Sequence, residues 1–406
     1  MKNKITRELI EKLPKTDLHV HLDGSIRIGT LIELAKEAKV ELPSYTEDGL
    51  RELVFKDNYN SLEEYLAGFG LTCGVMKNKE QLERIAYELA IDNQQEGVRY
   101  VEVRFAPQLH SRQNFDLIAV LHAVNDGLQK AKDEFNKRAE VVLEAEPPFE
   151  YGIIACAMRY FDEHFSTYFR SFINLHRYSD PDRVYALSSR EVAQAAARAY
   201  HADGLPVVGV DLAGPEEGFA PHHHREAYEF AHRNFLQKTV HAGEAYGPES
   251  VFQAITELHA DRIGHGTSLL NPKAIRDPEI KDPEDYVHDL VQYIANRRIT
   301  LEICLTSNQQ TNPVYRDLKK HPFGQMMDEK LSLTLCTDNR TISNTTVTDE
   351  ILKAVTSFDL DMADLKNLLV YGFKRSFFAK SYSAKRAYVR RCMDYLEKIT
   401  DDHFNT

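Results

Sequence analysis

The feature that most constrains the fold is a series of short apolar runs, spread over the whole chain and separated by longer amphipathic segments. Each run is rich in Val, Ile, Leu or aromatic residues and is bounded by turn-forming residues, which is typical of strands buried on both faces. Eight runs fit this description: 17–20, 100–105, 151–157, 206–212, 239–241, 262–264, 300–304 and 333–337.

The segments between these runs carry apolar residues at helical spacing, as in 79–90 and 182–201. Strands that alternate with amphipathic helices predict a parallel sheet with helices on its faces. Eight such units would close into an α/β barrel of the (β/α)8, or TIM, type. The alternative is an open doubly wound sheet, but no GxGxxG or GxxxxGK loop follows any of the runs.

A barrel needs only about 250 residues, so a chain of 406 has a surplus to place. Most of it lies between the first two runs, at about 25–98, where the sequence is helical, and 363–378 and 384–399 indicate C-terminal helices. A charged insert with three prolines, 271–286, looks like a solvated loop. With no linker, repeat or low-complexity tract, we predict one elaborated domain over residues 1–406.

The composition limits the possible binding partners of the protein and its cellular compartment. The net charge of −12 and the absence of a basic run argue against nucleic acid or an anionic membrane as a partner. The charged N-terminal residues lack a secretory apolar stretch, and no run of ~18 apolar residues is present. The five cysteines show no CxxC spacing, which favours free thiols in a reducing compartment. We therefore expect a cytoplasmic protein.

Four of the eight runs lead into residues that can bind a metal. His19 and His21 are two residues apart, so their side chains point to the same side of a strand. Taken alone, an HxH pair is usually a coincidence or a core pair. His241, His265 and Asp338, however, also follow apolar runs, and a set of three or four His with one Asp leaves a coordination position open. The pattern predicts a catalytic Zn²⁺ site at the carboxyl ends of the strands.

Glu244 follows His241 by three residues in the sequence HAGE. The intervening glycine allows a sharp turn that returns the carboxyl group over the barrel mouth. A carboxyl group beside a metal in a dry pocket can deliver a proton near neutral pH. The alternative is a first-turn glutamate that favours a helix N-terminus.

With these residues in place, the chain resembles the adenosine deaminase family of the amidohydrolase superfamily over nearly its whole length. The resemblance rests on DLHVHLDGS, VRYVEVRFAP, VVGVDLAGPE, HAGE, RIGHGTSL, LEICLTSN and CTDNR, in the family's order. The TDNR form is similar to that of a bacterial branch. The HxE and PCxxC signature of cytidine-type zinc deaminases is absent.

The resemblance implies a (β/α)8 barrel and a role for each matched residue. One Zn²⁺ would be held by His19, His21, His241 and Asp338. His265 would serve as a base and electrostatic partner of the attacking water, together with Asp338, and Glu244 would protonate purine N1. The substrate would contact the backbone of Gly214, the ring of His21, and Asp23, which reaches the ribose 5′-hydroxyl.

Asn339 departs from a common form of the family, in which a second aspartate meets purine N7. N7 only accepts hydrogen bonds, so an aspartate there must be protonated, whereas an asparagine amide donates without that requirement. The alternative is that Asn339 caps the next turn. The resemblance therefore leaves the preference among purine substrates open at this residue.

Two further features receive structural interpretations. The triplet His222–His224 lies between a Gly/Pro-rich stretch and a helix, so we expect a solvated surface run rather than a metal site. Arg104 ends the second run, and we expect it to be a structural ion-pair partner near the mouth.

The expected activity is hydrolytic deamination of adenosine and 2′-deoxyadenosine, two purine nucleosides, to inosine and 2′-deoxyinosine. One alternative is another 6-aminopurine, namely adenine or a 5′- or N6-modified adenosine. Asp23 argues against AMP, because a phosphate would face a carboxylate. A remote alternative is a barrel that binds nucleosides or a protein partner without catalysis, although no metal ligand or proton donor is missing.

Overall fold

The fold is described from a computed structural model of the chain, which covers residues 5–59 and 62–405. The eight predicted strands are all present, and they pair in sequence order as one parallel sheet. Their bounds are β1 Lys15–His21, β2 Val98–Phe105, β3 Glu150–Met158, β4 Val207–Ala213, β5 Gln237–Ala242, β6 Arg262–His265, β7 Thr300–Ile303 and β8 Ser332–Leu335.

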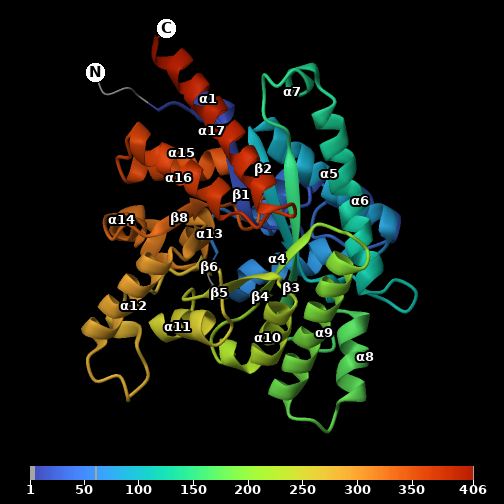
Figure 1. Ribbon diagram of the computed structural model, residues 1–406. Helices are drawn as coiled ribbons and strands as arrows, with labels where there is room; N and C mark the ends of the chain where they lie inside the picture. Colours follow the sequence, from blue (N-terminus) through green and yellow to red (C-terminus); the bar gives the residue numbers. More distant parts are fainter. Residues whose placement is uncertain (1–4, 60–61, 406) are drawn as a thin grey trace.

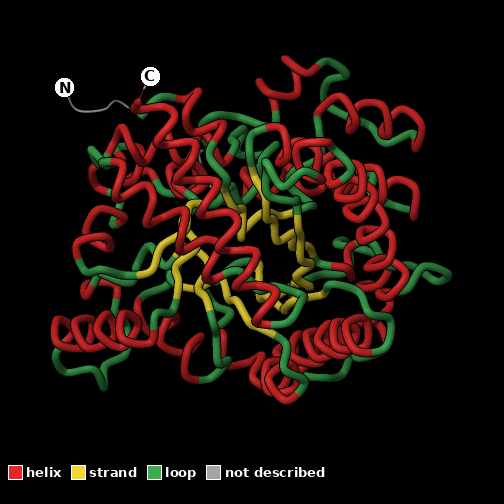
Figure 2. Tube along the Cα trace, turned by 45° about the horizontal axis from the view of Figure 1, so that its top comes forward, coloured by secondary structure: helices red, strands yellow, loops and turns green. Residues whose placement is uncertain are grey.

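The sheet closes on itself between its first and last strands. An isolated parallel bridge joins Val20 to Asp338. On either side of it, His21 N donates to Asp338 O at 2.7 Å, and Asp338 N donates to His19 O at 2.8 Å. Figure 2 shows the strands at the centre with the helices around them. The predicted (β/α)8 barrel is confirmed.

The helices surround the barrel and also extend it (Figure 1). They are α1 Arg7–Lys12, α2 Ile28–Ala38, α3 Glu47–Leu53, α4 Leu62–Gly74, α5 Lys79–Gln95, α6 Leu117–Asn136, α7 Ala139–Val142, α8 Thr167–Leu175, α9 Pro181–His201, α10 Arg225–Arg233, α11 Pro248–Thr256, α12 Pro283–Arg297, α13 Leu305–Thr311, α14 Phe323–Asp328, α15 Val347–Ser357, α16 Met362–Arg375 and α17 Tyr382–Asn405. None of the described helices is long and apolar enough to cross a membrane.

The surplus residues fold as predicted, with shifted boundaries. Helices α2 to α5 occupy the connection between β1 and β2, and α16 and α17 form the C-terminal extension. The segment 271–286 was predicted to be loop throughout, but its last four residues belong to α12, which begins at Pro283. Asp282 caps this helix, because its side chain accepts a hydrogen bond from the backbone N–H of Asp285. Proline is also favoured in the first turn of a helix.

Two strands end earlier than predicted, because the chain leaves the sheet to build the mouth. β7 ends at Ile303, and α13 begins at Leu305. β8 ends at Leu335, not at Thr337. Asp17 accepts hydrogen bonds from the backbone N–H and the hydroxyl of Thr337 at 3.3 and 2.6 Å, so this amide bonds to a side chain instead of a strand.

The interior of the barrel contains a buried layer of charged side chains beneath the mouth. Arg104 donates to Asp211 Oδ2 at 3.1 Å and to Glu302 Oε2 at 2.8 Å. Arg262 donates to Glu302 Oε1 at 2.6 Å and also pairs with Glu102. The interpretation of Arg104 as a structural ion-pair partner is confirmed. The cysteines are free thiols, also as predicted.

Candidate active site

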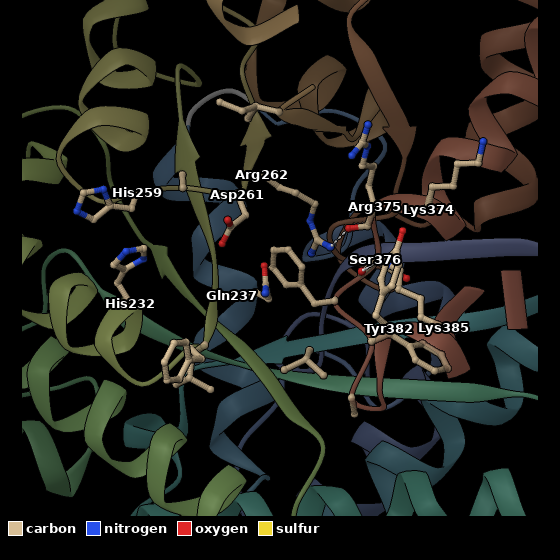
Figure 3. Close-up of a pocket in the computed structure, with 18 of the residues that line it drawn as sticks. His232, Gln237, His259, Asp261, Arg262, Lys374, Arg375, Ser376, Tyr382 and Lys385 are labelled. Atoms are coloured by element: carbon tan, nitrogen blue, oxygen red, sulfur yellow. Dashed lines mark hydrogen bonds between the residues drawn. The ribbon is translucent and has the colours of Figure 1, made fainter. Parts of the chain in front are cut away.

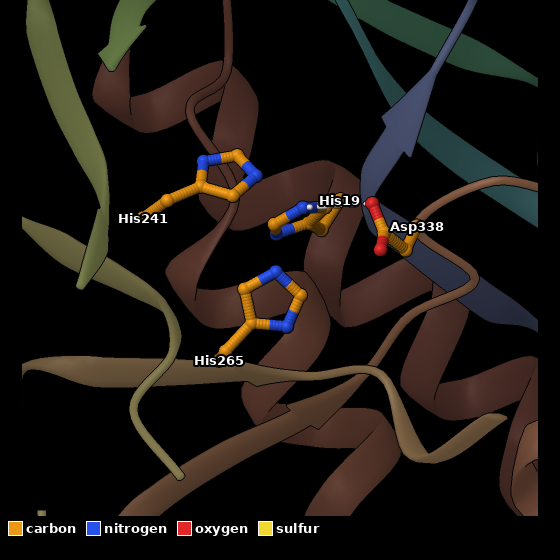
Figure 4. Close-up of side chains that lie close together, drawn as sticks. All are labelled: His19, His241, His265 and Asp338. Carbon is orange, nitrogen blue, oxygen red and sulfur yellow. Dashed lines mark ion pairs between the residues drawn. The ribbon is translucent and has the colours of Figure 1, made fainter. Parts of the chain in front are cut away.

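Five predicted site residues converge at the carboxyl ends of β1, β5, β6 and β8. His19, His241, His265 and Asp338 each offer a ligand atom, all within 4.8 Å of one another, and Figure 4 shows the four side chains gathered around one point. His21 joins them, because its Nε2 lies 3.2 Å from Nε2 of His241. All five side chains are buried.

The spacing of the ligand atoms fits a tetrahedral zinc ion. Ligands at about 2.0–2.1 Å from Zn²⁺ in tetrahedral arrangement lie about 3.3 Å from one another. Asp338 Oδ1 is 3.4 Å from Nε2 of His19 and 3.4 Å from Nε2 of His21. The buried Nε2 of His19 has no hydrogen-bond partner among the described residues, which suits a nitrogen that faces an ion.

The charged layer of the barrel holds two of these histidines from behind. His19 Nδ1 lies 2.8 Å from Glu302 Oε2, and His241 Nδ1 lies 3.1 Å from Asp211 Oδ2. Burial alone would raise the pKa of both carboxyl groups, but the nearby cations and imidazoles hold it well below its usual range. Each carboxylate therefore accepts an N–H at Nδ1 and leaves Nε2 free to bind a metal.

The charge states of the other two predicted ligands, His21 and Asp338, also suit a metal. Burial lowers the pKa of His21 well below its usual value, so the imidazole is neutral, as a metal ligand must be. Burial would raise the pKa of Asp338, but the surrounding imidazoles of His19, His265 and His21 hold it well below its usual range. Asp338 is therefore ionised.

Both His265 and Asp338 adopt left-handed backbone conformations, with φ of 64° and 60°. Such values are uncommon for residues other than glycine and are found at functional sites where surrounding structure enforces them. Here they turn the chain off β6 and β8 and direct both side chains into the mouth.

A hydrogen-bonded relay reaches His265 from behind. The backbone N–H of Phe323 donates to His321 Nδ1 at 3.1 Å, and His321 Nε2 lies 3.2 Å from Asn308 Oδ1. Asn308 Nδ2 in turn lies 3.2 Å from His265 Nδ1. Burial lowers the pKa of His321 to about 3, so it is neutral. The hydrogen bonds run in one direction from Phe323, so Nδ1 of His265 accepts from Asn308 and Nε2 is the ring nitrogen that carries a proton.

Glu244 lies over the cluster, with Oε2 3.8 Å from His265 Nε2 and its side chain 27% exposed. Its loop is held by Glu216, a buried residue that the sequence analysis missed. The Glu216 carboxylate accepts from the backbone N–H groups of Gly243, Glu244, Ala245 and Tyr246 at 2.6–3.0 Å. Glu216 lies two residues beyond Gly214 in the same motif, and a second acidic residue after a strand was the available signal.

Asp23 has partners that the sequence did not reveal. His110 Nε2 lies 2.6 Å from Asp23 Oδ1, and the backbone N–H of Ala106 donates to Oδ2 at 3.2 Å. The thiol of the half-buried Cys73 lies close to the buried Asp23 and His110. The Asp23 carboxylate is thus held in place by the imidazole of His110 and the backbone N–H of Ala106.

Gly214 directly follows β4 and has a φ of 101°, a conformation that favours glycine. Asn339 lies beside the ligand Asp338, and its Nδ2 donates to the hydroxyl of Tyr65 on α4 at 2.8 Å. This hydroxyl also lies 3.0 Å from Ser343 Oγ. Tyr65 was missed because its helix is far from Asn339 in sequence.

The prediction for the histidine triplet is wrong for one member. His222 is exposed and His223 is half-buried, but His224 is buried, and its Nδ1 lies 2.8 Å from Ser189 Oγ. A short 3-10 helix, Pro221–His224, turns this side chain toward α9. His224 therefore packs against α9 and is not part of a solvated surface run.

Comparison with known proteins agrees with this geometry. The family model for adenosine deaminase matches residues 14–389. An adenosine deaminase of Clostridium acetobutylicum is 32% identical over 93% of this chain and 96% of its own length. The chain belongs to the adenosine deaminase family. A probable adenosine deaminase of Dictyostelium discoideum is 34% identical over 92% of this chain, although that match spans only 42% of the longer relative.

Solved structures with the same barrel carry several names. An adenine deaminase from Arthrobacter aurescens is 20% identical, with a TM-score of 0.72 and coverage of 95% of this chain and 99% of the other. The N6-methyl-AMP deaminase of Arabidopsis thaliana is 24% identical, with a TM-score of 0.71 and coverage of 96% and 98%. A zinc-bound amidohydrolase is 19% identical, with a TM-score of 0.77 and coverage of 99% and 96%. These likenesses show the fold of the family, and this chain is an enzyme of that family.

Proposed function

We propose that the protein catalyses the zinc-dependent hydrolytic deamination of adenosine and 2′-deoxyadenosine, with inosine or 2′-deoxyinosine and ammonia as products. The observation that carries this proposal is the cluster of four imidazoles and the ionised Asp338, at the spacing of a tetrahedral zinc site, with Glu244 beside it. The relatives named adenosine deaminase support the choice of substrate.

One Zn²⁺ would be held by His19, His21, His241 and Asp338. When bound, the ion supplies Lewis acidity, which makes water a source of hydroxide near neutral pH. Glu302 and Asp211 hold the imidazoles of His19 and His241 in the tautomer that leaves Nε2 free to bind the metal.

Asp338 and His265 orient the attacking water in complementary ways. Ionised Asp338 only accepts hydrogen bonds, so it can receive a proton of the water. The relay through Asn308 places a proton on His265 Nε2, so in this tautomer His265 donates to the oxygen and stabilises its negative charge. The structure therefore favours the electrostatic role over the role of base.

Glu244 is the proton donor to purine N1. Protonation of N1 draws electron density from C6, where the water oxygen adds. The proton that Asp338 takes from the water passes to the 6-amino group, which leaves as ammonia, and the new C6 hydroxyl returns a proton to Glu244 as the carbonyl forms. Glu216 fixes the loop of Glu244 through four backbone hydrogen bonds. The Glu244 carboxyl group is therefore pre-organised to meet the purine ring.

The remaining predicted residues recognise the nucleoside. The Asp23 carboxylate accepts a hydrogen bond from the 5′-hydroxyl, and the N–H of Gly214 meets the ring. The Asn339 amide has two N–H groups, of which Tyr65 accepts one, so the other is available to purine N7.

A panel of 6-aminopurines tests this function: adenosine, 2′-deoxyadenosine, adenine, AMP and N6-methyladenosine, followed by ultraviolet absorbance. We expect the highest kcat/KM with the two unmodified nucleosides. Conversion of adenine or AMP without conversion of adenosine would contradict the proposal, and so would binding of adenosine by a zinc-loaded protein without turnover.

A further inference from the structure

A second cavity lies at the opposite end of the barrel from the histidine cluster. Its volume is about 760 Å³, and its walls include the starts of β4, β5 and β6 and the segment between α16 and α17. Figure 3 shows Gln237 and Arg262 at the strand starts, facing Arg375 at the end of α16, Ser376 in the segment and Lys385 in α17. Nothing in the proposed deamination uses this cavity.

The cavity concentrates positive charge that has no carboxylate partner. Arg298, Lys374 and Arg375 line it, and none of the three makes a side-chain ion pair within the described part of the chain. Lys385 donates to a backbone carbonyl, Ser376 O, at 2.6 Å. The buried Nε of Arg375 has no hydrogen-bond partner there either. In a protein of net charge −12, cations gathered in one cavity without ion-pair partners make an anion a suitable occupant.

The carboxylates nearby are already engaged. Asp261, which lines the cavity, lies 3.0 Å from Lys238 Nζ. Glu102 and Glu302 pair with Arg262. Arg298 and Arg375 line the same cavity, and the charge of Arg298, together with burial, lowers the pKa of Arg375. An anion between them would relieve that repulsion.

Three successive helix-to-strand turns around the cavity carry strained residues. Phe235, His259 and Arg298 precede β5, β6 and β7, line the cavity and have φ of 60°, 54° and 54°. Glycine is the usual residue in this left-handed position, and a side chain there costs about 1 kcal/mol. These three turns bring an aromatic ring, an imidazole and a guanidinium group to the wall of one cavity.

Aromatic rings complete the lining. Phe235 is 86% exposed and Tyr382 is 76% exposed, and both belong to the cavity wall. Exposed aromatic rings in the same cavity as unpaired arginines can bind a base together with its phosphates.

We propose that this cavity binds a nucleoside polyphosphate, with its phosphates at Arg298, Arg375 and Lys385 and its base against Phe235 or Tyr382. The site is separate from the proposed deaminase centre, which lies at the other end of the strands, so the two proposals stand or fall independently.

Calorimetric titration of the whole protein with uridine triphosphate, tripolyphosphate and uridine tests the site. A pyrimidine nucleotide is chosen so that the purine site does not contribute. At physiological salt we expect saturable binding of uridine triphosphate, weaker binding of tripolyphosphate and no binding of uridine. Absence of uridine triphosphate binding would overturn the proposal, and equal affinity for tripolyphosphate would overturn the nucleotide assignment.

Glycine variants separate binding from folding. Arg298→Gly should weaken uridine triphosphate binding by about tenfold or more, because a charged hydrogen bond is lost, while thermal stability is kept or raised. Removal of the stacking ring, by Phe235→Gly or by Tyr382→Ala, should in one of the two variants reduce the affinity to that of tripolyphosphate; loss in neither would overturn the nucleotide assignment. Lys330→Gly is the matched control: Lys330 has a φ of 58° at the turn before β8, outside the cavity.

The control should gain stability in the same way and bind uridine triphosphate like the wild type. If Arg298→Gly and Lys330→Gly reduce the affinity equally, the cavity is not the binding site. If Arg298→Gly unfolds the protein while Lys330→Gly does not, Arg298 has a structural role and the proposal is wrong.

Discussion

The two ends of strand β1 bury charged or titratable side chains in opposite ways. At the carboxyl end, His19 and His21 face Asp338, and Glu302 holds His19 from behind. At the amino end, buried Lys15 donates to the carbonyl oxygens of Ile10 and Leu13 at 2.6 and 3.1 Å and has no ion-pair partner among the described residues. At the carboxyl end, the titratable side chains contact one another and buried carboxylates. At the amino end, Lys15 contacts only backbone carbonyl groups at the end of helix α1.

This difference indicates that the carboxyl end of the strand is suited to catalysis and that the amino end contributes to stability. The carboxyl end is a site in which proton positions are fixed before substrate arrives, as electrostatic catalysis requires. The amino end joins α1 to the barrel floor, which is the part of a TIM barrel that serves stability. Changes at the two ends should therefore affect different measurements.

The largest expected effect is at the carboxyl end. Glu244→Gln removes the proton for purine N1 but keeps the shape of the side chain, so turnover of adenosine should fall by about 10²–10⁴-fold. Zinc content should be unchanged. Glu217→Gln, at an exposed residue that pairs with Arg276, is the control and should keep full turnover. Normal turnover in Glu244→Gln would show that another group donates the proton.

The second effect tests the amino end. Burial lowers the pKa of Lys15 to about 7, whereas the unfolded chain keeps a pKa near 10.4, so between these values the unfolded state binds more protons. Stability should therefore rise with pH, by about 1.4 kcal/mol per unit and about 4 kcal/mol from pH 7 to 10, relative to Lys15→Met. Urea unfolding at both pH values measures the difference. Exposed Lys12→Met should show no such trend, and an identical trend in both variants would contradict the assignment.

The relay behind His265 gives the next effect. Asn308→Asp places an acceptor against His265 Nδ1, which draws the proton away from Nε2, so kcat should fall by about 10–100-fold and its pH profile should shift. Gln309→Glu makes the same charge change on the same helix, but Gln309 bonds to Arg316 O and Lys353 Nζ instead. Equal losses in the two variants, with unchanged pH profiles, would mean that the relay does not set the tautomer.

The smallest effect concerns substrate recognition. Tyr65→Phe removes the hydroxyl that fixes the Asn339 amide, so kcat/KM for adenosine should fall by about 5–30-fold, mainly through KM. Tyr59→Phe is the control, because its hydroxyl bonds to Lys56 N and Ile342 O and its ring packs against Tyr65. A loss in kcat alone, or the same loss in Tyr59→Phe, would argue against a role for Tyr65 in orienting Asn339.

The sequence was sufficient for the barrel and for the residues that converge at its mouth. His19, His21, His241, His265 and Asp338 could be predicted because they lie at or just past the carboxyl ends of four buried strands, and parallel strands bring such ends together. The helices added between β1 and β2 were visible for the same reason, since their periodicity is local.

The residues that hold the site in place could not be predicted, because they act across elements far apart in sequence. Glu216 binds a loop that begins 27 residues later, and Tyr65 lies 274 residues from Asn339. His224 was misjudged because a short 3-10 helix buries it. At the amino end, Phe235 and Arg298 occupy turns that sequence analysis recognises only when glycine is present.

The most direct test of the account is metal content and adenosine turnover measured on one preparation, before and after chelation and after return of zinc. We predict one zinc per chain, loss of inosine formation in the stripped protein and recovery in proportion to the zinc restored. Full adenosine turnover in protein stripped of metal would contradict the account.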